Sequence, residues 1–262
     1  MKVVLSIAGS DSSGGAGIQA DLKTFEAFNT FGTTAITVLT AQNTTGVEEI
    51  VPMDASFVQK QIEMVFKDFD VAAIKIGMLF NKEIIEMVAN VIKDLDIPIV
   101  LDPVAISKAG SPLLKDDAVK AMHTLFNNVT LITPNHHEAY AFFGYKHGDK
   151  KSLEVIKNLT TPVLVKHHVV ELAENRFSVD QLYFQDKKRV FQSPLIDTSS
   201  LHGTGCSYSS AITANLALGH SLEKSISIAK KFITRALIKA PDIGHGPGPI
   251  NHKEGGAYVE VA

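Results

Sequence analysis

Residues 97–103 read Ile-Pro-Ile-Val-Leu-Asp-Pro, an apolar run that ends abruptly on a carboxylate. The run has no alternation of polar and apolar side chains, so it predicts a strand, Ile97–Leu101, that is covered on both faces. Strands of this kind belong to open parallel sheets, whose ligand crevice lies at the carboxyl ends of the strands. Asp102, directly after the strand, is therefore expected in a ligand site.

Short β-branched runs recur on both sides of this stretch, and segments of helical period separate them. The predicted strands are Val3–Ala8, Thr34–Thr40, Ala72–Ile76, Ile97–Leu101, Val129–Thr133 and Pro162–Lys166. The predicted helices are Ala16–Phe28, Ser56–Phe66, Lys82–Lys93, Lys115–Phe126, Ser152–Asn158, Gly205–Leu218 and Leu222–Ala240. This alternation favours a mostly parallel central sheet with helices on both sides. Gln181–Val190 predicts an antiparallel hairpin at one sheet edge. We expect residues 1–262 to form one domain.

The composition is that of an ordinary globular protein, with 262 residues, 45% of them hydrophobic and 20% charged. A net charge of -3 gives no broad attraction to nucleic acid or to an anionic membrane. Cys206 is the only cysteine, so no disulfide can form within the chain. The N-terminal apolar run is too short for a signal peptide or a membrane span, and we expect a cytoplasmic protein.

A glycine cluster follows the first predicted strand, in the stretch GSDSSGGAG at residues 9–17. Glycines allow positive φ angles and let a backbone approach a ligand closely. The spacing Gly15-x-Gly17-x-x-Ala20 also matches the dinucleotide fingerprint formally. However, five residues separate Gly14 from the strand, and the next strand ends without a carboxylate for a ribose. The sequence does not support a nucleotide-binding P-loop either, because the chain contains no GxxxxGK[ST] run.

A second glycine motif, DTSSLHGTGC at residues 197–206, directly precedes a predicted helix. Glycines before a helix let successive backbone N–H groups converge on one point, where the helix dipole also favours an anion. The turn Gly203-Thr204-Gly205-Cys206 is thus expected to stabilise a phosphoryl group in transfer. Cys206 lies in the first helical turn, where a thiolate is stabilised, although a lone cysteine is also a common buried packing residue.

Taken together, seven motifs resemble one family of kinases. They are GSDSSGGAGIQADLKTF, TAQNTTGV, KIGML, LDPV, LITPN-x-x-EA, DTSSLHGTGC and GPGPINH, which begin at residues 9, 40, 75, 101, 131, 197 and 246. Their order is similar to that in hydroxymethylpyrimidine and phosphomethylpyrimidine kinases of thiamine biosynthesis, a branch of the ribokinase-like superfamily. The resemblance covers essentially the whole chain. It implies a ribokinase-like three-layer α/β/α sandwich, ATP and Mg²⁺ as cofactors, a small pyrimidine substrate and a homodimer.

The resemblance also implies roles for residues around the substrate. Gln42 would pair with the aminopyrimidine edge, since a carboxamide both donates and accepts hydrogen bonds. Asp21 would bind the hydroxymethyl group, and Gly9 would let the backbone come close. Met78 and Val104 would line the pyrimidine face, although ordinary core packing explains such residues equally well. Cys206 takes the position at which ribokinase relatives carry a catalytic aspartate.

For the nucleotide and the metal, the resemblance implies contacts from five residues: Asn135, Lys166 and Lys230 near ATP, and Asp102 and Glu138 around the magnesium–phosphate water shell. Lys231 is an alternative to Lys230. After Lys166 the family usually continues with Gly-Gly-His, whereas this chain has His167-His168-Val169. His136 and His137 could suggest zinc, but without further ligands at a usual spacing we interpret them as surface residues.

The predicted function is ATP-dependent phosphorylation of 4-amino-5-hydroxymethyl-2-methylpyrimidine and of its monophosphate. The alternatives are a pyridoxal kinase, a nicotinamide-dependent oxidoreductase based on the Gly15-x-Gly17 spacing, and a pyrimidine-binding regulator without turnover.

Overall fold

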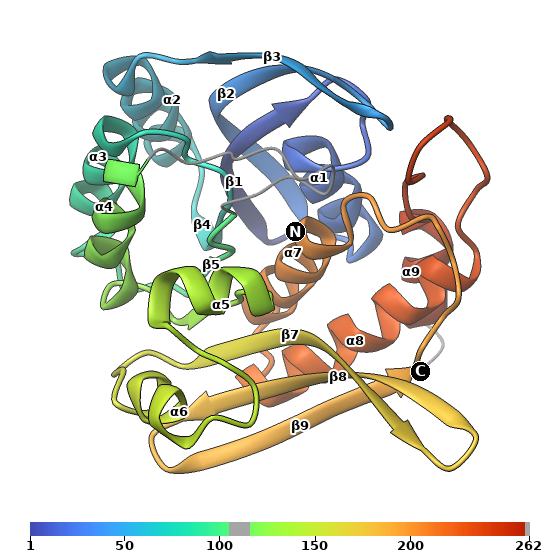
Figure 1. The fold of residues 1–262 in the computed structure, drawn as a ribbon. Coiled ribbons are helices and arrows are strands. Elements are labelled where there is room, and N and C mark those ends of the chain that lie inside the picture. The colour runs from blue at the N-terminus through green and yellow to red at the C-terminus, as the bar shows by residue number, and fades with distance from the viewer. Residues whose placement is uncertain (105–115, 260–262) are drawn as a thin grey trace.

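In the computed structural model, which describes residues 1–104 and 116–259, one sheet of nine strands runs through the molecule (Figure 1). The strand order is β3-β2-β1-β4-β5-β6-β7-β8-β9. The strands are β1 (Val3–Asp11), β2 (Phe31–Asn43), β3 (Gly46–Pro52), β4 (Val71–Ile76), β5 (Ile99–Leu101), β6 (Leu131–Ile132), β7 (Val163–Leu172), β8 (Asn175–Phe184) and β9 (Lys187–Pro194). Neighbours from β2 to β7 pair in parallel, whereas β3, β8 and β9 pair antiparallel.

Helices cover both faces of this sheet (Figure 1). They are α1 (Gly17–Ala27), α2 (Ala55–Asp68), α3 (Lys82–Ile92), α4 (Asp116–Phe126), α5 (His136–Phe143), α6 (Lys150–Lys157), α7 (Thr204–Ala217), α8 (Leu222–Ile238) and α9 (His252–Val259). Side chains of α2 to α6 belong to one buried cluster, and those of α1, α7 and α8 belong to another. The chain is therefore a three-layer α/β/α sandwich.

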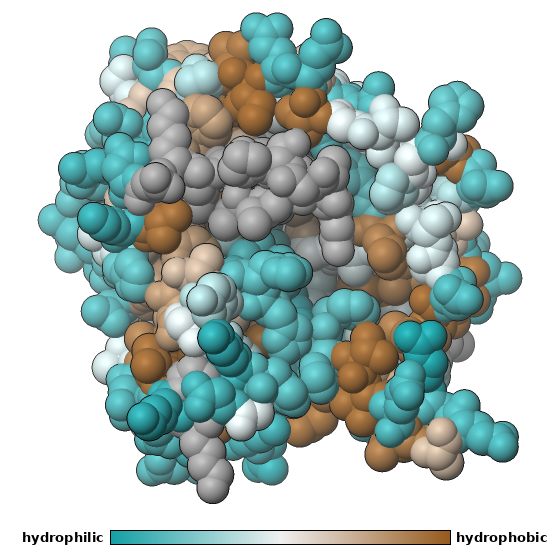
Figure 2. Space-filling model, in the orientation of Figure 1, coloured by the Kyte–Doolittle hydropathy of each residue, from teal (hydrophilic) through white to brown (hydrophobic). Residues whose placement is uncertain are grey.

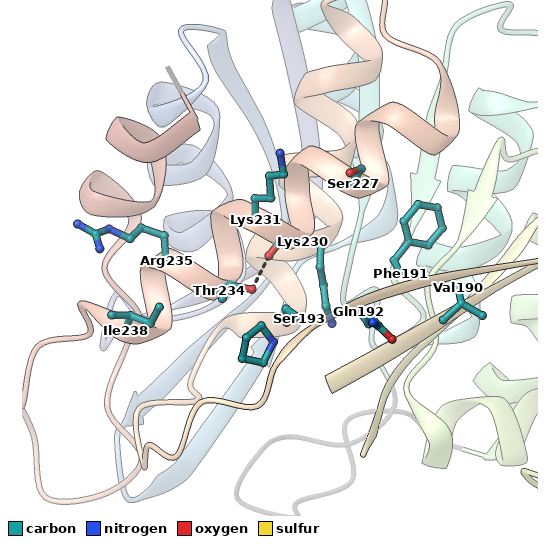
Figure 3. A pocket seen from close by; sticks show the side chains of 11 residues that line it. Val190, Phe191, Gln192, Ser193, Ser227, Lys230, Lys231, Thr234, Arg235 and Ile238 are labelled. Carbon is teal, nitrogen blue, oxygen red and sulfur yellow. Dashed lines mark hydrogen bonds between the residues drawn. The ribbon is translucent and has the colours of Figure 1, made fainter. Parts of the chain in front are cut away.

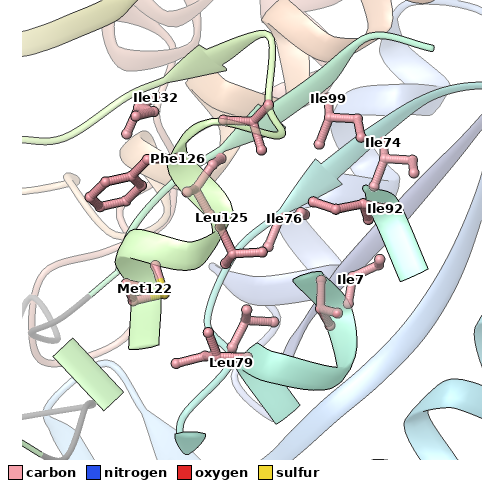
Figure 4. Close-up of a cluster of buried hydrophobic side chains, with 14 of the residues drawn as sticks. Ile7, Ile74, Ile76, Leu79, Ile92, Ile99, Met122, Leu125, Phe126 and Ile132 are labelled. Carbon is pink, nitrogen blue, oxygen red and sulfur yellow. The ribbon is translucent and has the colours of Figure 1, made fainter. Parts of the chain in front are cut away.

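The two clusters meet the sheet on opposite faces, because successive side chains of a strand alternate. On β1, Leu5 and Ile7 pack into the cluster under α2 to α6, whereas Val4 packs toward α7 and α8. Figure 4 shows the first cluster, in which Ile74 and Ile76 of β4 lie between β1 and the helices α3 and α4. Burial on both faces explains why the central strands read as continuous apolar runs.

Every predicted strand and helix is present, and the hairpin Gln181–Val190 lies at the β9 edge with Gln185 in its turn at a φ of 54°. Lys115, in the predicted helix 115–126, lies outside the described residues. Three elements were not predicted: β3, α5 and α9. The strand predicted as Pro162–Lys166 also continues to Leu172, so that β7 and β8 form a second long hairpin.

The surface gives no sign of a large apolar face on the side seen in Figure 2, where hydrophobic side chains are scattered among hydrophilic ones. Among the described residues, no helix is both long and apolar enough to cross a bilayer.

Candidate active site

A cavity of about 590 Å³ opens at the carboxyl ends of the parallel strands. Consecutive strand ends contribute to it: Gly9 from β1, Gln42 from β2, Met78 beyond β4 and Asp102 beyond β5. The remaining walls come from the glycine cluster, from Asn135 to Glu138, from Lys166 and from the start of α7. The lining residues are Ala8, Gly9, Ser10, Asp11, Ala16, Gly17, Thr40, Gln42, Lys75, Met78, Asp102, Val104, Asn135, His137, Glu138, Lys166, His202, Gly203, Gly205 and Cys206.

Asp11 organises the glycine cluster. Its carboxylate accepts hydrogen bonds from the backbone N–H groups of Ser13 (2.8 Å), Gly15 (3.2 Å) and Ala16 (2.7 Å). The Nε2 atom of His202 lies 2.7 Å from its Oδ2 atom, which joins the N-terminal loop to the second glycine motif. Burial alone would raise the pKa of Asp11, but the bonds from His202, Ser13 and Ala16 outweigh it and lower the pKa to about 2.

The glycines of the two motifs pack against each other. A Cβ atom on Gly15 would lie 2.3 Å from the His202 ring, and one on Gly17 would lie 2.4 Å from the carbonyl oxygen of Gly9. Gly203 has a φ of +78°, and a Cβ atom there would meet the carbonyl oxygen of Gly15 at 1.8 Å. The Gly15-x-Gly17 spacing therefore serves contact within the chain, and the oxidoreductase alternative loses the observation on which it rested.

Helix α7 begins where the second motif predicted. Gly203 is its N-cap, and the amide of Thr204 donates to the carbonyl oxygen of Leu201 at 3.3 Å. Gly205 and Cys206 follow in the first turn and line the cavity. The first amides of a helix have no acceptor within it, and the dipole favours an anion there. Thr204 does not line the cavity, since its hydroxyl donates to Leu201 at 2.8 Å.

Cys206 is a thiol in this environment. Burial is the main cause that raises its pKa to about 11; Lys75 and the amide of Gly17 act to lower the pKa, and the carboxylates of Asp21 and Asp102 act to raise it. The helix N-terminus therefore does not produce a stable thiolate here, in contrast to the expectation from position alone.

Asp102 and Lys166 form a buried ion pair on the cavity wall. The Lys166 Nζ atom lies 2.7 Å from the Asp102 Oδ1 atom, and both side chains are almost fully buried. Burial alone would lower the pKa of Lys166, but Asp102 and Glu138 outweigh it and raise that pKa above its ordinary value. The geometry therefore keeps a positive charge fixed beside the first turn of α7.

Asn135 and Glu138 form a capping box at the start of α5. The Asn135 side chain accepts from the Glu138 amide at 2.9 Å, and the Glu138 carboxylate accepts from the Asn135 amide at 2.8 Å. The N-x-x-E spacing thus has a structural reason, and it is the sequence signal by which the unpredicted helix α5 could have been found. Both residues also face the cavity.

The carboxylates of Asp102 and Glu138 are compatible with magnesium. Both line the cavity, and magnesium needs only one or two carboxylates because it keeps waters and binds phosphate oxygens. No cluster of three or more His, Cys, Asp or Glu in the described part of the chain could hold a metal by itself.

Four of the residues expected to contact the pyrimidine line this cavity: Gln42, Gly9, Met78 and Val104. Gly9 lies at a register shift of β1 against β2, and a Cβ atom there would lie 2.7 Å from a methyl group of Val38. The missing side chain at this bulge lets the buried Val38 side chain pack directly against the β1 backbone.

Asp21 lies beneath the cavity and is not on its wall, in contrast to the expected role in binding the hydroxymethyl group. Its side chain is fully buried, and its carboxylate is bonded to Ser6 (2.6 Å), Ser210 (2.7 Å) and Lys75 (2.8 and 2.9 Å). The side chain that reaches the cavity from this group is that of Lys75, which the sequence did not suggest. Asp11 and His202 were missed as well, although their motifs were recognised.

Lys230 faces a different cavity, of about 600 Å³, between β9 and α8 (Figure 3). Its Nζ atom lies 2.8 Å from Asp180 and 3.1 Å from Ser178, both on β8. Lys231 and Arg235 line the same cavity, together with the apolar side chains of Val190, Phe191 and Ile238. Lys230 and Lys166 are therefore in separate cavities.

Of the two histidines predicted to be surface residues, His137 is exposed and His136 is only partly exposed. His136 is half-buried, with its ring 5.5 Å from that of His168 and 6.1 Å from that of His147. Burial and the neighbouring imidazoles lower its pKa to about 4. The sequence hides this cluster because its members come from three separate segments.

The chain is similar to known kinases over nearly its whole length. The Haemophilus influenzae hydroxymethylpyrimidine/phosphomethylpyrimidine kinase is 44% identical, over 96% of this chain and 97% of the relative. A Bacillus subtilis pyridoxal kinase in complex with ADP superposes with a TM-score of 0.86 at 35% identity, covering 97% of this chain and 98% of that one. A phosphomethylpyrimidine kinase from Clostridium difficile has a TM-score of 0.74 at 38% identity, covering 90% of this chain and 100% of that one. The phosphomethylpyrimidine kinase family model matches residues 11–251, and the chain belongs to that family, with its ribokinase-like fold.

Proposed function

We propose that this protein transfers the γ-phosphate of ATP to 4-amino-5-hydroxymethyl-2-methylpyrimidine, and then a second phosphate to the monophosphate, for thiamine biosynthesis. The observation that carries this proposal is the cavity itself. Gln42 and Met78, which we call the substrate wall, line the same cavity as the first turn of α7 and Lys166, which we call the phosphate wall. An alcohol bound at the substrate wall would therefore share one cavity with a site suited to a phosphoryl group.

The substrate wall fits an aminopyrimidine. The Gln42 carboxamide can donate to a ring nitrogen and accept from the neighbouring exocyclic amine. Met78 and Val104 supply apolar contacts for the ring faces, and the Gly9 backbone borders the same space. With the ring held by these four residues, the hydroxymethyl group points toward Cys206.

The phosphate wall acts by position and charge. The acceptor oxygen forms a bond to the γ-phosphorus, while the bond from that phosphorus to the bridging oxygen breaks and its electron pair leaves with ADP. The amides of Gly205 and Cys206, the dipole of α7 and the Lys166 ammonium can stabilise the negative charge of the phosphoryl oxygens. When bound, magnesium would be held by Asp102 and Glu138 through its waters and would neutralise phosphate charge.

Cys206 receives the hydroxyl proton in this proposal. A pKa of about 11 makes the thiolate a minor form at neutral pH. Because phosphoryl transfer passes through a loose transition state, little base strength is required of the protein. Positioning of the alcohol by the cavity then contributes more than the basicity of the thiol.

The nucleotide also requires a place for its base. We propose that the part of the nucleotide beyond its phosphates contacts Lys230 and the second cavity, whose walls are cationic and apolar. Asn135 would hold the phosphate side through the capped turn before α5. A single domain, a homodimer and a cytoplasmic location remain predictions.

The test is an assay of ADP release with the pyrimidine alcohol, ATP and magnesium. We expect turnover, and formation of the pyrophosphate after the monophosphate. Circular dichroism reports whether the protein is folded, since the chain contains no tryptophan for fluorescence. Folded protein that binds the pyrimidine without releasing ADP would support the regulator alternative and refute the kinase.

Pyridoxal phosphorylation is the second candidate, because the Bacillus subtilis pyridoxal kinase superposes with a TM-score of 0.86. Turnover of pyridoxal and of the pyrimidine alcohol should be compared as kcat/KM on the same preparation. We expect the pyrimidine to be preferred, since Gln42 can pair with its amine and ring nitrogen together. A higher kcat/KM for pyridoxal would reverse the assignment.

A further inference from the structure

Lys75 is a fully buried lysine in the centre of the sheet. It belongs to β4, whose sequence is otherwise Val-Ala-Ala-Ile-x-Ile, and its exposed fraction is 0%. Burying an ammonium and a carboxylate costs several kcal/mol of hydration, and a hydrophobic pair of similar volume is often at least as stable. Stability is therefore a poor explanation for a lysine at this place, and a role in the adjacent cavity is the better one.

The ammonium is held rigidly by its partner. The Nζ atom lies 2.9 and 2.8 Å from the two carboxylate oxygens of Asp21. Ser6 of β1 and Ser210 of α7 donate to the same carboxylate at 2.6 and 2.7 Å. Four short hydrogen bonds from three elements fix Asp21, and Asp21 in turn fixes Lys75.

The positive end of the ion pair faces the cavity. Lys75 lines the cavity, whereas Asp21 lies behind it. Gly77 leaves room for the ammonium, since a Cβ atom there would lie 2.8 Å from Nζ. An ammonium has three N–H donors, and the two Asp21 oxygens account for two of them. Lys75, Cys206 and Asp102 line the same cavity, and the positive charge of Lys75 acts to lower the pKa of the Cys206 thiol.

We propose that Lys75 is a positioning residue for phosphoryl transfer: its clamped ammonium holds a fixed positive charge on the wall of the cavity that Cys206 also lines. The proposal rests on the proposed kinase function. The hydroxyl proton passes to the Cys206 sulfur as the new oxygen–phosphorus bond forms and the bond to ADP breaks. Lys75 stabilises the anionic sulfur that accepts this proton, and itself neither gains nor loses one.

The test replaces the pair as a unit, with Asp21→Asn and Lys75→Met in one variant. Removing both charges leaves no unpaired ion in the core. Methionine has a similar unbranched shape, and asparagine can still accept from a serine hydroxyl. The matched control is Lys82→Met with Glu86→Gln, an exposed pair at 3.6 Å on α3. A second variant, Gly77→Ala, displaces the ammonium but keeps both charges.

Two readouts separate positioning from structure. Cys206 is the only cysteine, so its alkylation by iodoacetamide at pH 8 reports thiolate formation without interference. In the double variant we expect alkylation about tenfold slower, kcat lower by roughly 10- to 100-fold, and the pyrimidine KM within about threefold of wild type. Gly77→Ala should show a smaller change of the same kind, and the control pair none.

Unchanged alkylation and kcat in a folded double variant would overturn the proposal. A rise in KM with unchanged alkylation would also overturn it, because that result indicates only a structural role. If the double variant does not fold, the alkylation rate of Cys206 and the kcat of Gly77→Ala test the proposal instead, and unchanged values would overturn it. If wild-type protein does not phosphorylate the pyrimidine, the proposed function fails, and the alkylation rates still decide whether Lys75 acts on Cys206.

Discussion

Asp11 offers the most direct test of how the two glycine motifs are held together. Its carboxylate accepts from the amides of Ser13, Gly15 and Ala16 and lies 2.7 Å from the His202 ring. In Asp11→Asn the side chain keeps its shape but loses the negative charge. One of its two oxygens also becomes an NH₂ group, which cannot accept from these donors.

The magnitude follows from proton affinity. Folding lowers the pKa of Asp11 from 3.8 to about 2, and each tenfold change in proton affinity corresponds to about 1.4 kcal/mol. The ionised carboxylate therefore contributes roughly 2 kcal/mol to the free energy of unfolding. Since the folded pKa lies below the unfolded one, this contribution is present above about pH 4 and is lost as the pH falls toward 2.

The assay is urea unfolding followed by circular dichroism, at pH 7 and at steps from pH 5 to pH 3. We expect Asp11→Asn to unfold with about 2 kcal/mol less free energy at pH 7, and the difference from wild type to shrink below pH 4. The control is Asp54→Asn, an exposed aspartate at the N-cap of α2 whose side chain makes no capping bond. A difference that stays constant down to pH 3, or one below about 0.5 kcal/mol at pH 7, would refute the reasoning.

Three further predictions concern single side chains. Cys206→Ala should lower kcat strongly, by roughly 100-fold, while isothermal titration shows pyrimidine binding nearly unchanged. If the variant keeps most of the wild-type rate, the thiol is only a packing residue. Gln42→Ala should raise the pyrimidine KM by about tenfold with little change in kcat, and the opposite split would remove Gln42 from the ring site. His136 has a folded pKa of about 4 against an ordinary 6.5, so stability is lost as the pH falls from about 6.5 toward 4. His136→Leu should flatten that loss in thermal melts, whereas His220→Leu, at an exposed position, should not.

The fold could be predicted where strands are buried on both faces, because such strands have continuous apolar sequences. The strands β1, β4 and β5 are mostly apolar, and their predicted positions agree with the structure. The edge strand β3 was missed because its sequence, Gly-Val-Glu-Glu-Ile-Val-Pro, is largely exposed and carries no such run. The second half of β7 was missed for the same reason, since pairing with β8 and not burial makes it a strand.

The residues of the site could be predicted where they belong to recognised sequence motifs. Gln42, Asp102, Glu138, Lys166 and Cys206 line the same cavity, as their motifs implied. What motifs could not supply is the pairing of charges across the sheet. Asp21 and Lys75 are 54 residues apart, and only the folded structure shows which of the two faces the cavity. An acidic residue in a recognised motif was therefore assigned to the substrate, although its partner lines the site.

The turn at Gly203 and the loop at Gly15 are one structural unit, although 188 residues separate them. Neither position tolerates a Cβ atom, because the backbone of Gly15 occupies that space at Gly203 and the His202 ring occupies it at Gly15. The His202–Asp11 contact at 2.7 Å then locks the loop against the turn. Gly205 and Cys206 thereby line the same cavity as Gly9 and Gln42. The glycines thus set the shape of this side of the cavity, because close contact between the two motifs is possible only where neither carries a side chain.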